Sequence, residues 1–361
     1  MSSIKVSYSE SDAARQCKLK WHLAYVERWR TTDTPAALAR GTALHAVQET
    51  HYAALQLRNP TETPDKDFLA TLRGHMVEHG LLEVEGGDES VDWMYDGYTE
   101  FYGCDNAWEI LAIEVDFDIP LYDHTGAESQ FRLQGRIDLI VRNRGTGKIF
   151  VVDHKTCSNL PTAKALDFDE QMALYTIAGR RMGFDVYGAI YNAIRSKKLV
   201  RKMTPEERFS RAIVTKTEFE LTVVEHELVE TMLDAHRPRQ MDPPRSPDPD
   251  RCNWKCPFKE ACLAGRKMGP VRMREFLRDT GFKQPDGYPD AIAAAERTAT
   301  PAVGDQMDLI AELEKLDPRS GDTVRVVSGL SEASPATVSG SEARDAYDRP
   351  LSLISRLMRG S

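Results

Sequence analysis

The sequence has 361 residues but no run of about 18 consecutive apolar ones, the length that a membrane-spanning helix needs. Its first residues, MSSIKVSYSE, lack the basic start and the apolar stretch of a secretory signal. We therefore expect a cytoplasmic protein with no membrane partner. An excess of basic residues is also lacking, since the net charge is −9. This charge argues against coating nucleic acid by bulk charge, but it is compatible with an enzyme that gathers carboxylates around metal ions.

Helical patterns dominate the N-terminal part of the chain. A first helix is predicted over about residues 9–30, with Ser9 or Ser11 as its N-cap, because a serine hydroxyl can accept a hydrogen bond from the first turn. A second helix is predicted to open at Pro35, and further helical segments follow between about residues 66 and 106. We therefore expect a helical region before the next part of the chain.

The pattern changes near residue 108, where apolar and polar residues begin to alternate as they do in half-buried strands. The segments predicted to be strands are 108–121, 131–141, 148–155 and 186–194. One helix is predicted between the last two strands, over about residues 165–182, and another over about residues 216–236. This order predicts an α/β fold whose core is a mixed sheet flanked by helices.

The last third of the chain shows weaker patterns. Five prolines between residues 238 and 249 exclude regular structure there, and three cysteines follow closely. Beyond about residue 325 the composition predicts disorder, although 349–360 could form a short amphipathic helix. We divide the chain into an N-terminal helical region (1–107), an α/β core (108–215), a helix with a cysteine loop (216–270) and a partly disordered C-terminal extension (271–361).

Two aspartates and a lysine interrupt what is otherwise an apolar hairpin. Asp153 and Lys155 lie two residues apart on a predicted strand, so their side chains share one face while His154 points to the other. Asp138 lies near the end of the neighbouring strand. Two carboxylates and a backbone carbonyl form a set of hard oxygen ligands that suits Mg²⁺ or Mn²⁺, and Glu114 could add another. The alternative is a surface ion pair between Asp138 and Lys155.

Five short motifs surround these residues. They are GTALH (41–45), IEVDF around Glu114, GRID ending at Asp138, DHK (153–155) and QMALY (171–175). In this order and spacing they resemble the PD-(D/E)XK nuclease superfamily, and within it the RecB-like exonuclease branch. The proline of the superfamily's name is absent, since Ile137 precedes Asp138. The resemblance implies a restriction-endonuclease-like core over residues 108–215.

The same resemblance implies a metal-dependent deoxyribonuclease that hydrolyses phosphodiester bonds at DNA ends, with single strands favoured. The implied ligands of Mg²⁺ or Mn²⁺ are His45, Asp138, Asp153 and the backbone carbonyl of His154. The implied catalytic residues are Lys155, Asp153, Asp138, Glu114, Gln171 and Tyr175. DNA is the implied partner, with a recombinase, annealing protein or helicase as a candidate second partner. The implied setting is recombination, repair or phage replication in the cytoplasm of a bacterium or of a phage's bacterial host.

Six cysteines are present, and three of them are clustered. Cys252, Cys256 and Cys262 are separated by three and five residues, which is too close for a disulfide framework, and thiols stay reduced in the cytoplasm. Clustered thiolates indicate zinc or an iron–sulfur cluster. Cys104 and Cys157 have no partner spacing, and we expect them to be plain buried thiols.

The RecB-like branch includes iron–sulfur nucleases with one cysteine before the nuclease motifs and three after them. By this resemblance a [4Fe–4S] cluster would be held by Cys17, Cys252, Cys256 and Cys262. These relatives usually have two residues between the first pair of the trio, whereas this chain has three. The alternative is a zinc site made by the trio and an outside ligand such as His236.

Two further signals bear on function. The segment RGTGKI is a hairpin turn and not a phosphate-binding loop, because Arg142 and Ile149 replace the glycine and the hydroxyl residue that such a loop requires. The basic run RSKKLVRK (195–202) is more often a solvated loop, but beside a nuclease site it could follow DNA phosphates. The competing functions are a structure-specific endonuclease and a non-catalytic iron–sulfur DNA-binding subunit.

Overall fold

The computed structural model describes residues 3–32, 35–58, 64–84, 87, 89–239, 241–254, 256–289 and 291–298. Contacts between Cα atoms divide the chain into two compact units. Unit 1 takes its described residues from 1–15 and 34–237, and unit 2 takes its own from 16–33 and 238–339. Each unit therefore joins segments that are far apart in the sequence. The predicted disorder beyond residue 325 and the predicted helix over 349–360 lie outside the described residues.

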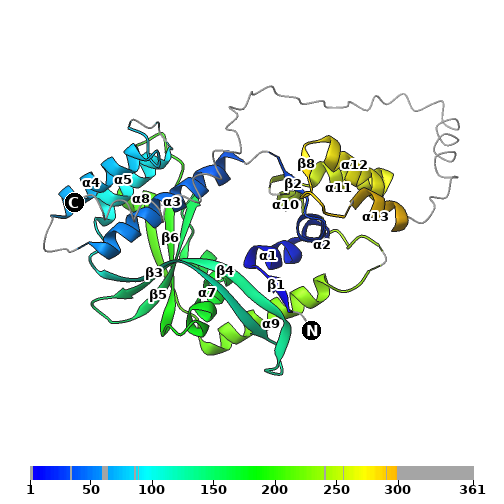
Figure 1. Cartoon of the computed structure of the whole chain (residues 1–361), viewed down its shortest axis with the longest axis horizontal. Coiled ribbons are helices and arrows are strands. Elements are labelled where there is room, and N and C mark those ends of the chain that lie inside the picture. The colour runs from blue at the N-terminus through cyan, green and yellow to red at the C-terminus, as the bar shows by residue number, and fades with distance from the viewer. Residues whose placement is uncertain are drawn as a thin grey trace. The chain divides into compact units, whose positions relative to one another are not determined.

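A sheet of six strands forms the centre of unit 1 (Figure 1). Its strands are β1 (Ile4–Val6), β3 (Trp108–Tyr122), β4 (Glu128–Asn143), β5 (Ile149–Cys157), β6 (Val186–Arg195) and β7 (Phe209–Val214). Their order is β1-β4-β5-β6-β7, with β3 also paired to β4. The β1–β4 and β5–β6 pairs are parallel, and the other pairs are antiparallel. The predicted mixed sheet is confirmed, whereas β1 and β7 were not predicted, because such short strands show little alternation.

Helices cover both faces of this sheet (Figure 1). They are α1 (Tyr8–Gln16), α3 (Ala36–Leu57), α4 (Asp65–Glu78), α5 (Val91–Tyr102), α6 (Ala163–Leu166), α7 (Glu170–Arg181), α8 (Pro205–Arg208) and α9 (Glu218–Ala235). Tyr52 of α3 packs in one buried cluster with Val152, whereas Gly179 of α7 lies against Val151. Because successive residues of a strand point to opposite faces, α3 and α7 lie on opposite sides of the sheet.

Side-chain caps fix the starts of the helices that follow the sheet strands. The Asp169 carboxylate accepts a hydrogen bond from the Met172 N–H at the start of α7. At the start of α9, the Thr217 hydroxyl accepts from the Glu220 N–H, and the Glu220 carboxylate accepts from the Thr217 N–H. Such caps satisfy backbone donors that a helix leaves free in its first turn. The two helices predicted over residues 165–182 and 216–236 are therefore present, the first with α6 split from α7.

Unit 2 combines a short N-terminal segment with C-terminal helices. Its elements are α2 (Lys18–Trp21), the π-helix η1 (His22–Val26), β2 (Arg30–Thr31), α10 (Pro249–Trp254), α11 (Lys259–Met268), α12 (Pro270–Asp279), β8 (Phe282–Lys283) and α13 (Ala291–Thr298). Leu19 and Leu23 pack with Phe258, Met273 and Leu277 in one buried cluster. Helices α10 to α13 were not predicted, and the segment expected to be a cysteine loop contains α10 and α11. In neither unit does a described helix combine the length and the apolar character that a membrane span requires.

The first predicted helix is wrong in its extent. Helix α1 ends at Gln16, Cys17 has an extended backbone (φ −166°, ψ 119°), and α2 begins at the next residue. The N-cap is Ser7 and not Ser9 or Ser11, because the Ser7 hydroxyl accepts a hydrogen bond from the Glu10 N–H (3.2 Å). The Cys17 thiol instead accepts a hydrogen bond from the Ser246 N–H (3.5 Å). A tertiary contact within unit 2 therefore replaces the continuous helix.

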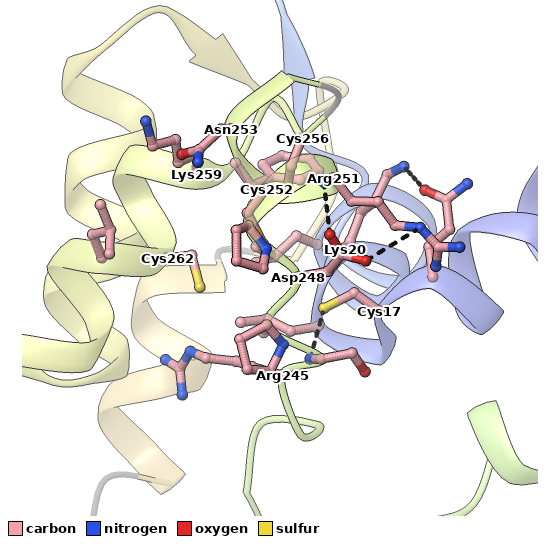
Figure 2. A pocket seen from close by; sticks show the side chains of 18 of the residues that line it. Cys17, Lys20, Arg245, Asp248, Arg251, Cys252, Asn253, Cys256, Lys259 and Cys262 are labelled. Carbon is pink, nitrogen blue, oxygen red and sulfur yellow. Dashed lines mark hydrogen bonds and ion pairs between the residues drawn. The ribbon is translucent and has the colours of Figure 1, made fainter.

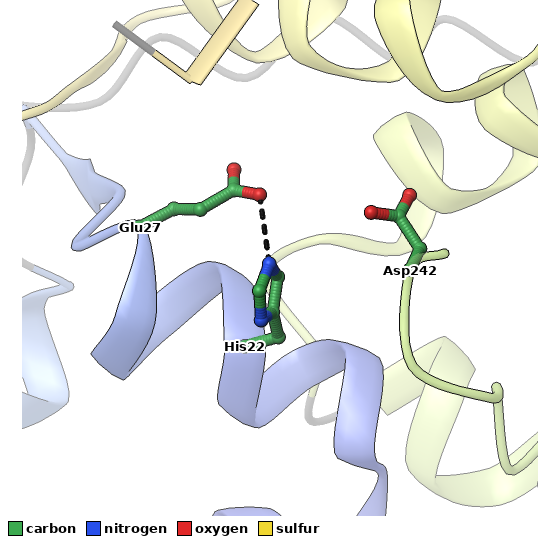
Figure 3. Close-up of side chains that lie close together, drawn as sticks. All are labelled: His22, Glu27 and Asp242. Atoms are coloured by element: carbon green, nitrogen blue, oxygen red, sulfur yellow. Dashed lines mark ion pairs between the residues drawn. The ribbon is translucent and has the colours of Figure 1, made fainter. Parts of the chain in front are cut away.

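A buried ion-pair network joins the two segments of unit 2. Arg274 of α12 is 3% exposed and donates hydrogen bonds to the carboxylates of Glu27 and Asp242. Glu27 also accepts from the Trp29 indole N–H (2.8 Å) and lies 3.1 Å from His22 Nε2 (Figure 3). His22, Glu27 and Asp242 are close enough to hold a metal ion. Because Arg274 already forms hydrogen bonds with both carboxylates, we assign no metal to this group.

We expect Arg274→Leu to lower the free energy of unfolding by about 3–5 kcal/mol, because the variant leaves the buried Glu27 carboxylate without its cation. Urea unfolding followed by tryptophan fluorescence measures this loss. The matched control is Arg272→Leu, since Arg272 forms a partly exposed pair with Glu275 (2.9 Å) on the same helix, and such pairs contribute about 1 kcal/mol or less. Equal losses in the two variants would contradict the assignment of the buried network.

Candidate active site

Strand β5 places two candidate catalytic residues on one face of the sheet. Lys155 Nζ donates a hydrogen bond to Asp153 Oδ1 (3.0 Å) and lies 2.9 Å from Asp153 Oδ2. The Asp153 residue is 3% exposed, so this pair is largely shielded from water. The His154 ring points to the other face, where it stacks on Tyr52 with the ring centroids 5.4 Å apart. The alternation of these three side chains is as the sequence predicted.

A second group of ligand atoms gathers beside this pair. His45 of α3, Glu114 of β3 and Asp138 of β4 each offer one atom, and these atoms lie within 4.8 Å of one another. His45 Nδ1 lies 3.5 Å from Asp138 Oδ2, which accepts a hydrogen bond from the His154 N–H (2.7 Å). Asp153 is not part of this group, because its carboxylate is turned toward Lys155. The structure thus brings three of the predicted metal-site residues together and leaves Asp153 beside them.

Gly41 explains how His45 comes close to the sheet. It lies one helical turn before His45 on α3, and a Cβ atom at this position would be 3.3 Å from Thr156 Oγ1 on β5. This separation is tighter than an ordinary packing contact, so a larger side chain would push the helix away from the strand. The glycine of the GTALH motif therefore sets the helix–strand spacing that allows His45 to approach Asp138.

Glu114 has a strained backbone within β3. Its φ is 48°, in the left-handed region, which costs a non-glycine residue on the order of 1–3 kcal/mol. The residues on either side pair regularly with β4, and this register puts Glu114 opposite Asp138. The irregularity therefore lies at the point where the Glu114 carboxylate joins the ligand group. Strain of this kind is concentrated at functional sites.

The ionisable groups of the site have shifted pKa values. Burial raises the pKa of Asp138 and the pKa of Asp153. Burial, followed by the charge of Asp138, raises the pKa of Glu114 to about 8. Burial lowers the pKa of His45, which keeps its ring neutral and able to bind a metal. For Lys155, burial opposes the charged form, but the Asp153 carboxylate outweighs it and raises the pKa, so the amine stays protonated.

Helix α7 forms one wall of the site. The Gln171 side chain donates from Nε2 to Asp153 Oδ1 (3.3 Å) and to the Tyr175 hydroxyl (2.9 Å). The two residues are four apart on one helix, so they share a face. The Tyr175 ring packs edge-on against Phe117, with the centroids 5.8 Å apart. Both residues that the QMALY motif predicted are therefore beside Asp153, which Gln171 helps to orient.

Helix α1 contributes residues that the sequence did not indicate. Burial and neighbouring carboxylates, Asp153 among them, raise the pKa of Tyr8 to about 12. Arg15 forms an ion pair with Glu170, the first residue of α7. The start of the chain thus supports the helix that carries Gln171. Because α1 is held in place by tertiary contacts, no local pattern could have shown this.

Glu49 of α3 is a further acidic residue that was missed. Its charge contributes to the raised pKa of Glu114, and burial raises the pKa of Glu49 itself. It lies four residues after His45, so both project from the same face of α3. That spacing was a signal in the sequence that could have identified it.

The residues of the site fit a divalent metal ion. An imidazole and two carboxylates converge, and such ligands suit Mg²⁺ or Mn²⁺. Asp153 Oδ2 is buried and, within the described part of the chain, accepts no hydrogen bond. The Lys155 ammonium lies 2.9 Å from this oxygen and supplies a single positive charge to the group of buried carboxylates. His45, Glu114, Asp138 and Asp153 are therefore the side chains that would hold the metal, and His154 forms a backbone hydrogen bond with His45.

A cavity of about 450 Å³ in unit 2 is lined by four cysteines (Figure 2). They are Cys17, which precedes α2, Cys252 of α10, Cys256, which precedes α11, and Cys262 of α11. Burial raises the pKa of the Cys256 thiol. Cationic side chains also line the cavity: Lys20, Arg245, Arg251, Lys259 and Arg266. All four cysteines predicted to form one site thus share one cavity, while Cys104 and Cys157 belong to unit 1, where the first is buried and the second half-buried.

The arrangement of the cysteine sulfur atoms can be compared with that of a zinc site. A tetrahedral zinc ion, with Zn–S bonds of about 2.3 Å, holds its sulfur ligands about 3.8 Å apart. Among the described residues, no three cysteine Sγ atoms lie within 4.8 Å of one another. Within the described residues, the thiols are therefore not arranged as a closed tetrahedral zinc site. His236, the outside zinc ligand considered from the sequence, belongs to unit 1, where its ring packs against Phe131.

The basic run 195–202 lies at the carboxyl-terminal edge of the parallel β5–β6 pair. The Ser196 N–H donates a hydrogen bond to the Cys157 carbonyl (2.9 Å), and Arg195 donates to Asn159 Oδ1 (2.9 Å). These bonds tie the start of the run to the residues that directly follow the catalytic strand. Lys197 and Lys202 are exposed. Positive charge is therefore available where the strand that bears Lys155 ends.

Comparisons with known proteins identify a family for this sequence. The family model described as "PD-(D/E)XK nuclease superfamily" matches residues 5–263, which is more than half of the chain. No curated protein matches the chain. Twenty chains of solved structures match it. One, described as "Crystal structure of SSO0001", is 16% identical and covers 70% of this chain and 95% of that chain, with a TM-score of 0.28.

We expect the stabilisation by Mn²⁺ to increase with pH. The raised pKa values of Glu114, Asp138 and Asp153 mean that these carboxyl groups bind more protons in the folded protein than in the unfolded chain. The metal-free protein therefore loses stability as the pH rises above about 4, the usual pKa of an unfolded carboxyl group. A bound cation removes this penalty, and at low pH it must first displace protons. The rise in Tm on adding Mn²⁺ should therefore be larger at pH about 8 than at pH about 5.5.

Differential scanning fluorimetry of the full chain measures this effect. The control is the double variant Glu114→Gln, Asp138→Asn, which lacks two of the titrating groups and should show a smaller metal response at both pH values. A wild-type response of equal size at the two pH values would contradict the expectation.

Proposed function

Because the chain belongs to the PD-(D/E)XK nuclease superfamily, we propose that it is a metal-dependent DNA exonuclease of the RecB-like branch. In this proposal it hydrolyses phosphodiester bonds at DNA ends and favours single strands. Members of the superfamily are typically metal-dependent nucleases that use Mg²⁺ or Mn²⁺. The observation that carries the proposal is the convergence of His45, Glu114 and Asp138 beside the Asp153–Lys155 pair.

Each side chain has a defined part in the proposed hydrolysis. A bound Mg²⁺ or Mn²⁺ would supply Lewis acidity and would lower the pKa of a water molecule. The neutral ring of His45 and the carboxylates of Glu114 and Asp138 would hold this cation. Asp153, which pairs with Lys155, would add its negative charge beside them. The protonated Lys155 acts as a hydrogen-bond donor and as a positive charge beside the phosphate, since an ammonium group has no lone pair to accept a proton.

The chemical change is a displacement at phosphorus. A bond forms between phosphorus and the water oxygen, the bond to the sugar oxygen breaks, and the leaving oxygen takes up a proton. Negative charge on the phosphoryl oxygens is greatest during this exchange, and a cation held at a fixed position stabilises it without having to reorganise. The contacts of Lys155 with both Asp153 oxygens (3.0 and 2.9 Å) fix the ammonium in this way.

The assignment to the RecB-like branch rests on the helical motifs. Gly41 and His45 of α3 bring an imidazole to the carboxylates, and Gln171 and Tyr175 of α7 line the wall beside Asp153. The branch acts at DNA ends, which supports exonuclease action here. The corresponding process would be recombination, repair or phage replication in a bacterial cytoplasm, with a recombinase, annealing protein or helicase as a second partner.

We propose that the cysteine cavity of unit 2 holds a [4Fe–4S] cluster. All four cysteines line this one cavity, and the basic side chains around it would compensate the charge of four thiolates. In this role Cys17 would connect the segment before the nuclease motifs to the three cysteines after them. Zinc is the alternative, and the metal content distinguishes the two.

The position of the basic run 195–202 supports a proposal for where the DNA strand lies. Its start is hydrogen-bonded to the end of β5, and Lys197 and Lys202 are exposed. In an acidic protein, a local group of cations of this kind attracts phosphates to one place. We therefore propose that the strand to be cut passes along this run on its way to Lys155.

We expect Mn²⁺-dependent shortening of end-labelled single-stranded DNA, and a loss of at least about 100-fold in rate for Lys155→Ala, because the variant removes a fixed positive charge from the transition state. The matched control is Lys66→Ala, which truncates an exposed lysine of the same unit. A denaturing gel of timed samples measures the rate. Cleavage of a closed circular strand would instead favour an endonuclease, and an unaffected Lys155→Ala variant would contradict the mechanism.

We expect Cys17→Ser to give colourless and poorly soluble protein, because loss of the cluster removes a link between two distant segments of the chain. Protein purified without oxygen is assayed for iron, sulfide and an absorption band near about 400 nm. Cys157→Ser is the control, since this thiol belongs to unit 1 and lies 3.8 Å from the Ile194 carbonyl. A brown, normally soluble Cys17→Ser variant would contradict the cluster, as would zinc in place of iron in the wild type.

A further inference from the structure

A row of polar side chains crosses three adjacent strands of unit 1. In the register of the sheet, His154 of β5 pairs with Asn192 of β6, and Asn192 pairs with Arg211 of β7. Their side chains are hydrogen-bonded in the same order: Arg211 Nε donates to Asn192 Oδ1 (3.3 Å), and Asn192 Nδ2 lies 2.6 Å from His154 Nδ1. Asn192 is 0% and His154 3% exposed. The row therefore runs through the interior up to the catalytic strand.

The outer end of the row is a fixed ion pair. Arg211 donates to both oxygens of Asp105 (2.5 and 2.8 Å) and to the Tyr98 hydroxyl (2.7 Å). The Tyr52 hydroxyl also donates to Asp105 (2.8 Å). Tyr98 and Tyr52 are both 1% exposed. A buried ion pair contributes little net stability compared with apolar residues of the same volume. Stability alone is thus a weak reason for so many polar groups in this position.

The inner end of the row is the residue between Asp153 and Lys155. Asn192 Nδ2 donates to the Tyr98 hydroxyl (2.9 Å) as well as to His154. Because an amide nitrogen can only donate, His154 Nδ1 is the acceptor of this hydrogen bond. The ring is also stacked on Tyr52. The orientation of the His154 side chain is therefore fixed by two different contacts.

The backbone of His154 takes part in the metal-site geometry. Its N–H donates the 2.7 Å hydrogen bond to Asp138 Oδ2, the carboxylate that meets His45 and Glu114. A small rotation of this peptide would lengthen that bond and would also move the side chains of Asp153 and Lys155. Ligand atoms need to be held within about 0.5 Å of the productive geometry.

We propose that Arg211, Asn192 and the His154 ring are positioning residues for the metal site. They fix the backbone of His154, which lies between Asp153 and Lys155, from the face of the sheet opposite to the side chains of these two residues. The proposal rests on the proposed function only in that a divalent metal binds there. It adds a polar row on β6 and β7 to a site whose motifs lie on α3, β3, β4, β5 and α7.

The test compares two buried histidines whose rings contact the same tyrosine, His154 stacked on it and His51 edge-on. His154 and His51 lie with their ring centroids 5.4 and 5.0 Å from that of Tyr52, and both are almost fully buried. His51 bonds to the Tyr95 hydroxyl (3.0 Å) and not to Asn192. His154→Phe and His51→Phe therefore remove the same polar group from one layer of the core, but only the first breaks the row.

The main measurement is Mn²⁺ binding without DNA, followed by the electron paramagnetic resonance signal of free Mn²⁺ in the full-length protein. We expect His154→Phe and Asn192→Leu to weaken Mn²⁺ binding about 10- to 100-fold, as loss of supporting hydrogen bonds does at other metal sites. His51→Phe should lower Tm to a similar extent and leave Mn²⁺ affinity within about twofold of the wild type. His154→Gln, whose carbonyl oxygen can accept from Asn192, should recover part of the loss.

The outcomes separate this proposal from the proposed function. Weakened Mn²⁺ binding in the row variants supports positioning even if no DNA substrate is cleaved, a result that would count against the nuclease activity alone. Wild-type Mn²⁺ affinity in His154→Phe, or an equal loss in His51→Phe, would overturn the proposal and leave the row as core packing. A wild-type protein that binds no Mn²⁺ would overturn both.

Discussion

The hydrogen bond from the His154 N–H to Asp138 is the contact on which the candidate site depends. It joins β4 to β5 where the ladder between these strands gives way to the site, since the regular pairs end with Leu139 and Val152. Carboxylates that are buried side by side repel one another, and burial itself opposes their charge. One lysine supplies only part of the compensation, so the arrangement favours binding a further cation. A divalent metal ion bound there would supply the missing positive charge.

Strand β5 directs neighbouring side chains of the candidate site to opposite faces of the sheet. Asp153 and Lys155 point to the face of α7, whereas His154 points to the face of α3 and α5, where aromatic and polar side chains hold it. Because successive side chains of a strand point to opposite faces, these three consecutive residues of β5 reach both faces of the sheet. Glu114 shows the limit of this regularity, since its side chain joins the group only through a left-handed backbone. A regular sheet supplies most of the site, and one strained residue completes it.

The sequence predicted what local patterns encode. The strands with alternating residues, the helices near residues 165–182 and 216–236 and the spacing of the motifs were visible, and the structure brings His45, Glu114, Asp138, Gln171 and Tyr175 to one site. The break at Cys17, the Ser7 cap and the placement of Tyr8 and Arg15 depend on tertiary contacts, so no window of sequence contains them. The row of Asn192 and Arg211 was missed because each residue, read alone, fits an ordinary strand. Pairing across strands gives them their shared environment.

Unit 2 raises a different physical problem, because its two segments are separated by most of unit 1 in the sequence. Bringing them together costs conformational entropy, and the apolar cluster of Leu19 and Leu23 with the C-terminal helices offsets part of that cost. The Glu27–Arg274 pair adds one polar link between the segments. Cys17 and the other cysteines around the cavity lie on the same two segments, so a ligand bound by all four would form a second link. Such a link closes a long loop, and it restricts the unfolded chain more strongly than any local contact in the unit could.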